Sequence, residues 1–124
     1  MKFMKFQLFF IAGLVAFTFN GCEKDQPLTG VFKAKYVAGM CGQDIVEILD
    51  SNYYDKGINW TNTSGQNFKH VFTVQNHCYF GKASLKAGEV FNCQLIAKPG
   101  VNECVVCMAF METPPKAWNV KVVK

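Results

Sequence analysis

Residues 30–50, GVFKAKYVAGMCGQDIVEILD, have the pattern of a β-hairpin. From Phe32 to Tyr36 apolar residues alternate with lysines, which is the two-residue period of a strand with one buried face. The segment 39–42 is rich in glycine and suits a tight turn, and residues 44–50 then supply a second, largely apolar run. The sequence therefore predicts two antiparallel strands joined by a short turn.

Three further segments have strand character, namely 70–74, 88–97 and 118–123. In the clearest of them, Phe91, Cys93 and Leu95 fall on one face and polar residues on the other. The connecting segments are a long polar loop at 51–69, a connector at 76–87 with room for one helical turn, and a cysteine-bearing loop at 101–115.

No stretch of the predicted domain carries a convincing helical period over ten residues, which indicates an all-β fold. Five strands with a longer connection between the third and the fourth predict a small five-stranded OB-like barrel. We assign residues 29–124 to this barrel. A seven-stranded sandwich needs more strands than the sequence offers.

The N-terminus has the layout of a bacterial lipoprotein signal peptide. Lysines precede an apolar run from Phe6 to Phe19, and a glycine stands directly before Cys22. As a helix this run spans about 21 Å, whereas a bilayer core is roughly 30 Å thick, so a membrane-spanning helix is disfavoured. We expect residues 1–21 to be removed, Cys22 to carry the lipid, and residues 22–28 to form a tether. An ordinary signal peptide with an incidental cysteine is the alternative.

The predicted anchor also predicts a location. A short tether after a lipidated cysteine holds the folded part close to a membrane. Several further cysteines in an exported chain favour a Gram-negative envelope, whose periplasm is oxidising. We therefore expect a lipoprotein anchored to the outer membrane, on its periplasmic face or at the cell surface.

The charge of the chain argues against nucleic-acid binding. All 13 cationic side chains are lysines, and the formal net charge is +4. Loss of Lys2 and Lys5 with the signal peptide lowers it from +4 to +2. A weak, dispersed positive charge without arginine lacks both the basic face and the bidentate donor that nucleic-acid recognition uses.

Five cysteines remain once Cys22 is set aside, and in an exported protein they predict disulfides before metal ligands. Cys93 lies inside a predicted strand between apolar residues, so we expect it to be a free, buried thiol. The remaining four lie in turns or loops and allow three pairings: Cys41, Cys78, Cys104 and Cys107.

Several segments taken together resemble small OB-like lipoproteins of Gram-negative bacteria, a loosely defined group of uncharacterised function. These segments are Gly39-Met40-Cys41-Gly42, Val71–Cys78, Leu85–Phe91 and Cys104–Phe110. The resemblance covers most of residues 29–124. It implies a disulfide between the first hairpin and the segment before the last strand, and it transfers no catalytic residue.

Among the three pairings we favour Cys41 with either Cys104 or Cys107, and Cys78 with the other. Two other chemistries remain open. The spacing of Cys104 and Cys107 is that of dithiol oxidoreductases, although two valines fill the gap and prolines follow soon after. His77 with Cys78, Cys104 and Cys107 has ligand types that suit zinc.

Two apolar groups are candidates for surface contacts. Tyr53, Tyr54 and Trp60 punctuate the polar loop and are expected either to pin it to the barrel or to form a contact surface. A second group follows the C-x-x-C spacing and is interpreted as core packing, with an exposed contact patch as the alternative: Met108, Phe110 and Met111.

The sequence shows neither a Ser/His/Asp order nor paired carboxylates nor a phosphate-binding loop. We therefore predict a non-catalytic, membrane-anchored binding module without a cofactor, whose ligand is an unidentified protein or small molecule. One alternative is a thiol–disulfide redox protein that uses Cys104 and Cys107. The other is an inhibitor of a foreign hydrolase.

Overall fold

A computed structural model describes residues 26–97 and 99–124. Its elements are β1 (Phe32–Met40), β2 (Gln43–Ile48), the 3-10 helix η1 (Ser51–Lys56), β3 (Ile58–Thr61), β4 (Asn67–Val74), α1 (His77–Gly81), β5 (Val90–Ile96) and β6 (Ala117–Val123). The predicted signal peptide, residues 1–21, and the predicted lipidation site, Cys22, lie outside the described residues.

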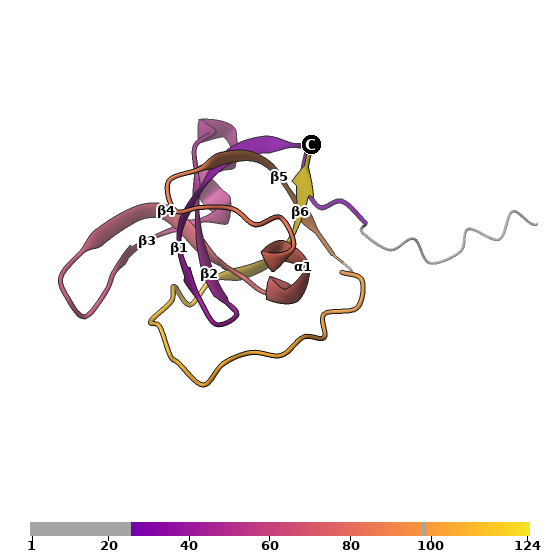
Figure 1. The fold of residues 1–124 in the computed structure, drawn as a ribbon. Coiled ribbons are helices and arrows are strands. Elements are labelled where there is room, and N and C mark those ends of the chain that lie inside the picture. The colour runs from indigo at the N-terminus through magenta and orange to yellow at the C-terminus, as the bar shows by residue number, and fades with distance from the viewer. Residues whose placement is uncertain (1–25, 98) are drawn as a thin grey trace, which may run out of the picture.

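Five strands form a closed barrel (Figure 1). β1 pairs antiparallel with β2 and β5, β5 with β6, and β2 with β4. β4 and β6 pair in parallel at Thr73–Ala117 and Val74–Trp118, which completes the ring. This arrangement confirms the predicted all-β class and the small five-stranded OB-like barrel.

Alternate side chains from the five strands fill the barrel interior. On β5, Phe91, Cys93 and Leu95 are buried, as the alternation predicts. Helix α1, the single helical turn expected within 76–87, adds Phe80 to this core. The Phe80 ring meets the Phe91 ring edge-on at a centroid distance of 5.7 Å, so the helix is held by the same hydrophobic core as the strands.

The segment 51–69 was predicted as one long loop, and this prediction is wrong. It contains η1, β3 and the start of β4. Trp60 on β3 lies opposite Phe68 on β4, with ring centroids 5.5 Å apart, and the hairpin extends beyond the barrel (Figure 1). β3 has four residues in a polar neighbourhood, so its periodicity is too short to be recognised in the sequence.

The turn between β1 and β2 is confirmed and consists of Cys41 and Gly42. Their φ angles are 52° and 85°, and Met40 pairs with Gln43 across them. Positive φ at both central residues is the geometry of a type I′ hairpin turn. A Cβ atom on Gly42 would lie 2.8 Å from both the Val106 and the His77 side chains, so glycine lets two other segments approach this turn.

Asn76, between β4 and α1, is a buried polar residue that takes part in strand pairing. Its Nδ2 donates to the carbonyl of Val120, and its Oδ1 accepts from the N–H of Val120, both at 2.8 Å. The side chain therefore satisfies two backbone groups of β6 beyond the last paired residue of β4.

Candidate functional site

Two disulfides fasten the connection between β5 and β6 to the barrel. Cys107 is bonded to Cys41 in the β1–β2 turn, with Cα atoms 5.0 Å apart. Cys104 is bonded to Cys78 in α1, with Cα atoms 5.7 Å apart. Of the pairings left open by the sequence, the structure selects these two, which agrees with the predicted link between the first hairpin and the segment before the last strand.

Hydrogen bonds extend this fastening along residues 99–116, which we call the stapled loop. Asn102 accepts from the backbone N–H of Cys78 at 2.9 Å, next to the Cys78–Cys104 disulfide. Further along, Glu112 accepts from both the N–H and the hydroxyl of Thr63, at 3.0 and 2.8 Å, in the β3–β4 turn. The loop therefore contacts α1, the β1–β2 turn and the β3–β4 hairpin in succession, and Figure 1 shows the path of its backbone.

The stapled loop displays apolar side chains to solvent. Val105 and Met108 are fully exposed and Phe110 is 81% exposed. Core packing was expected for Met108 and Phe110, and this expectation is wrong, whereas Met111 is half-buried. Large apolar side chains gathered on one exposed segment mark an interaction surface more often than a chance excess of surface hydrophobes.

A cavity of about 460 Å³ opens beneath the loop. It is lined by Cys41, Gly42, Asp44, His77, Gly81, Cys104, Val105, Val106 and Cys107. The disulfides form part of its wall, and two polar side chains, the carboxyl of Asp44 and the imidazole of His77, face it from the barrel side. The lining can therefore offer one acidic and one basic group to a small polar ligand.

Asp44 is held by Tyr36, whose hydroxyl donates to its Oδ1 at 2.8 Å. Burial raises the pKa of the Asp44 carboxyl, against the opposing effects of this hydrogen bond and of nearby His77. Burial, and then the hydrogen bond to Asp44, raise the pKa of Tyr36, so its hydroxyl stays protonated and keeps donating at physiological pH. The hydrogen bond between Tyr36 and Asp44 therefore fixes the orientation of the Asp44 carboxyl in the cavity wall.

The pairing of the cysteines bears directly on the two alternative chemistries. Cys104 and Cys107 are not bonded to each other, so their C-x-x-C spacing does not form the dithiol–disulfide couple of an oxidoreductase. The donor atoms of His77, Cys78 and Cys104 lie within 4.8 Å of one another. The two sulfurs are joined in a disulfide, however, and neither is a thiolate that could bind zinc in this covalent state.

Cys93 lies in the barrel interior and is the free cysteine among the described residues. Burial raises the pKa of its thiol to about 12. Since the thiolate is the reactive form, both shielding and protonation make this sulfur inert in the folded chain. Its position agrees with the free, buried thiol expected from the sequence.

We expect an alkylating reagent, without reductant, to leave Cys93 unmodified in the native chain and to modify it after unfolding in guanidinium. The two disulfide pairs should remain unlabelled in both conditions because they offer no thiol. Peptide mapping by mass spectrometry measures the sites, and Cys93→Ala serves as the control. Rapid native labelling at Cys104 and Cys107 would contradict the structural role given to these two residues.

The aromatic residues predicted as a contact surface are divided by the structure. Tyr53 stacks on Phe32 with ring centroids 4.8 Å apart, and Tyr54 stacks on His70 at 3.7 Å. Both tyrosines pack against the core, so they pin η1 to the barrel. Trp60 lies half-buried on β3, where its ring stacks on Phe68 and not on the core. A contact role for this segment stays a prediction and concerns Trp60.

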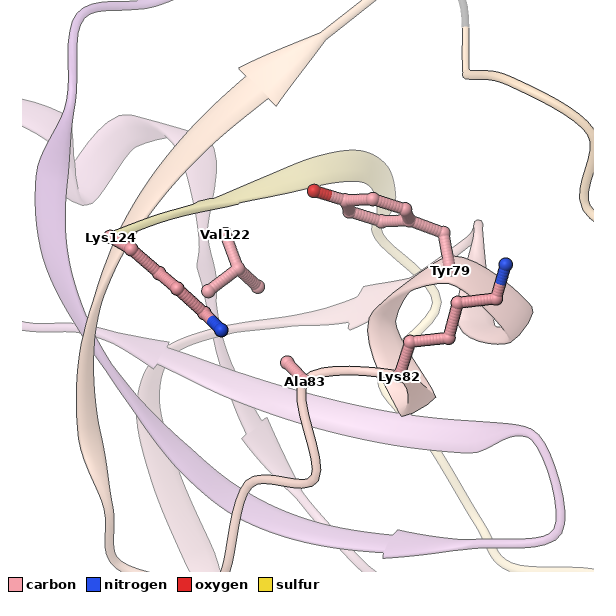
Figure 2. Close-up of a pocket in the computed structure, with 5 residues that line it drawn as sticks. All are labelled: Tyr79, Lys82, Ala83, Val122 and Lys124. Atoms are coloured by element: carbon pink, nitrogen blue, oxygen red, sulfur yellow. The ribbon is translucent and has the colours of Figure 1, made fainter.

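Two other cavities lie on the described surface. One of about 160 Å³ is lined by Tyr79, Lys82, Ala83, Val122 and Lys124. Figure 2 shows that the two lysine ammonium groups do not converge, so they do not form an anion site. The other, of about 490 Å³, lies over β1 and the end of β2 and is lined by Val31, Phe32, Lys33, Leu49, Asp50 and Asn92.

The chain matches no protein-family model, and no curated protein or solved structure is significantly similar to it. None of the helices in the described part of the chain is long and apolar enough to cross a bilayer. The resemblance to OB-like lipoproteins therefore stays a prediction, and the functional argument depends on the geometry of the stapled loop.

Sequence reasoning missed the role of Val105 and placed Asn76 and Asn102 only in connecting segments. The sequence signal that was available for the loop is its composition. Two cysteines and three prolines within residues 99–116 disfavour a regular helix or strand there. No sequence signal distinguishes the asparagines, since asparagine is an ordinary residue of turns.

Proposed function

We propose that this chain is a non-catalytic lipoprotein of a Gram-negative envelope, anchored by a lipid on Cys22, and that it works as a binding module. The observation that carries the proposal is the stapled loop, where two disulfides hold exposed apolar side chains on a closed barrel. The outer membrane, on its periplasmic face or at the cell surface, is the proposed location.

A binding loop that is ordered before its ligand arrives has a lower entropic cost of binding. A loop that must become ordered on binding loses conformational entropy at that moment, and this loss weakens the affinity. Here the cross-links to Cys41 and Cys78 restrict residues 104 and 107 before any ligand arrives. An apolar surface that is preorganised in this way suits binding, since the exposed side chains at its centre, Val105, Met108 and Phe110, carry no titratable group.

OB-like barrels commonly bind ligands with the loops after their first and fourth strands. In this chain these are the β1–β2 turn and the stapled loop, and the Cys41–Cys107 disulfide joins them. The correspondence is an analogy of fold. It supports placing the binding surface on the stapled loop, with the cavity at Asp44 and His77 as the adjoining place for a small ligand.

We expect the chain, expressed in a Gram-negative host fed an alkyne-tagged fatty acid, to incorporate the tag, and Cys22→Ser to abolish the incorporation. The lipid is attached to the sulfur of Cys22, and serine cannot replace that thioether. In-gel fluorescence and the intact mass of the mature chain measure the modification, and Glu23→Gln is the matched control that keeps the cysteine. Tagging that persists in Cys22→Ser, or a mature chain without acyl groups, would overturn the anchor.

A further inference from the structure

We propose that the stapled loop inserts its exposed apolar side chains into the same phospholipid surface that holds the lipid anchor. This inference rests on the proposed function, because it requires the lipid on Cys22. The structure points to it through three features: the kind of side chain on the loop, the place where the tether joins the barrel, and the rigidity of the loop.

The loop offers exposed apolar surface that includes neither tryptophan nor tyrosine nor arginine. Residues 99–116 contain no tryptophan, tyrosine or arginine, the residues in which protein–protein hot spots are enriched. Its exposed apolar side chains are aliphatic, thioether or phenyl groups, namely Val101, Val105, Val106, Met108 and Phe110. Side chains of this kind carry no hydrogen-bonding donor and can enter the outer, interfacial part of a bilayer.

The tether joins the barrel beside the start of the stapled loop. The backbone N–H of Ala97 donates to the carbonyl of Gln26 at 2.7 Å, and Pro27 forms an isolated bridge with Ile96. The loop begins two residues after Ala97, at Pro99. Figure 1 shows the first described residues lying next to this point. The chain that comes from the anchor and the first residues of the loop therefore leave the barrel at the same end of β5, whereas residues 104 and 107 are fastened to α1 and to the β1–β2 turn.

The length of the tether keeps this end of the barrel close to the membrane. Gln26 is four residues after Cys22, and four residues span at most about 14 Å in any conformation. The tether confines the whole barrel to the membrane surface, so the loop meets that surface at a high effective concentration and weak apolar contacts can contribute to seating it.

The loop cannot fold its apolar side chains back into the barrel, and two of its three charged side chains are engaged with the barrel, while Glu103 is exposed. The disulfides at Cys104 and Cys107 fix the backbone on either side of Val105. Glu112 is turned toward Thr63, and the Lys116 ammonium donates to the carbonyl of Asp55 at 2.9 Å. Since the contact is apolar and lacks a basic cluster, we expect it to be insensitive to salt and to anionic lipid content.

The test uses the full, acylated chain in vesicles of phosphatidylethanolamine and phosphatidylglycerol. A photoreactive diazirine amino acid replaces Met108 in one sample and Val90 in the other. Val90 is the matched control, because it is an exposed apolar residue at the opposite end of β5 from Ile96. After illumination, we expect mass spectrometry to find phospholipid adducts in the sample with the probe at position 108. The sample with the probe at position 90 is expected to give none.

A second variant checks that apolar insertion causes the adducts. With the diazirine at position 105, the double substitution Met108→Glu and Phe110→Glu is expected to abolish the lipid adducts. Both side chains are exposed, so the fold and the two disulfides should be unchanged, and a non-reducing intact mass checks this. Equal adducts at positions 108 and 90, or adducts that persist in the double variant, would overturn the inference.

The outcomes separate this inference from the proposed function. An unacylated mature chain would mean that the anchor itself is wrong. An acylated chain without lipid adducts at position 108 would leave the anchor intact and overturn only the insertion of the loop. If the same probe in whole cells links to a protein and not to phospholipid, a protein partner covers the loop and the lipid inference fails.

Discussion

Replacing Cys41 and Cys107 together by serine is expected to lower the free energy of unfolding by about 4 kcal/mol. The two residues are separated by 66 positions, so their bond closes a long loop of the unfolded chain. Allowing for the shortcut through the Cys78–Cys104 bond, the loop-entropy relation still gives a value of this size. For a domain of about 100 residues this is a large part of a total stability of roughly 5–15 kcal/mol.

Urea denaturation followed by circular dichroism measures the change, with both variants kept free of reductant. The matched variant is Cys78→Ser with Cys104→Ser, whose disulfide spans 26 residues. It is expected to lose slightly less stability, about 3.5 kcal/mol, because loop-closure entropy grows only with the logarithm of loop length. A loss below about 1 kcal/mol for the longer link would show that the unfolded chain is already constrained in another way.

The second large effect is expected from Asn76→Leu, which keeps the approximate shape of the side chain and removes both of its hydrogen-bonding groups. The N–H and the carbonyl of Val120 would then be buried without partners. Each unsatisfied buried group costs about 1–3 kcal/mol, so we expect a loss of roughly 2–6 kcal/mol in unfolding free energy.

Asn76→Asp separates the two bonds. A carboxylate still accepts from the Val120 N–H but cannot donate to the Val120 carbonyl, and its burial as an ion is unfavourable. Asn92→Ala, on the exposed face of β5, is the control and is expected to change stability by less than about 0.5 kcal/mol. Chemical denaturation measures all three variants, and a neutral result for Asn76→Leu would contradict a role in closing the barrel.

The barrel was predictable because its strands follow simple rules of alternation. Phe91, Cys93 and Leu95 occupy every second position of β5, and the glycine-rich turn at Cys41 and Gly42 marks the first hairpin. These signals are local, so they are present in the sequence. The hairpin of β3 was not predicted because four residues give too few periods, and its pairing depends on contacts such as Trp60 with Phe68.

The candidate site was predictable only in part. The sequence indicated which four cysteines form disulfides, but Cys104 and Cys107 are three positions apart in an irregular loop, so spacing cannot decide which of them reaches Cys41. The exposure of Met108 and Phe110 was missed because apolar residues are expected inside. In this chain the two disulfides hold the loop, with Met108 and Phe110 exposed, outside the barrel. This is a tertiary effect, so no local sequence pattern predicts it.

The two disulfides are nested, since the Cys78–Cys104 pair lies between Cys41 and Cys107 in the chain. If the chain is exported as proposed, Cys41 and Cys78 reach the oxidising compartment before Cys104 and Cys107, and Cys41 and Cys78 are not partners in the folded protein. Oxidation in order of emergence therefore gives a wrong bond that must be reshuffled by thiol–disulfide exchange. On this proposal we expect the native bonds to require a disulfide isomerase, or an oxidation slow enough for Cys104 and Cys107 to emerge before Cys41 and Cys78 are joined.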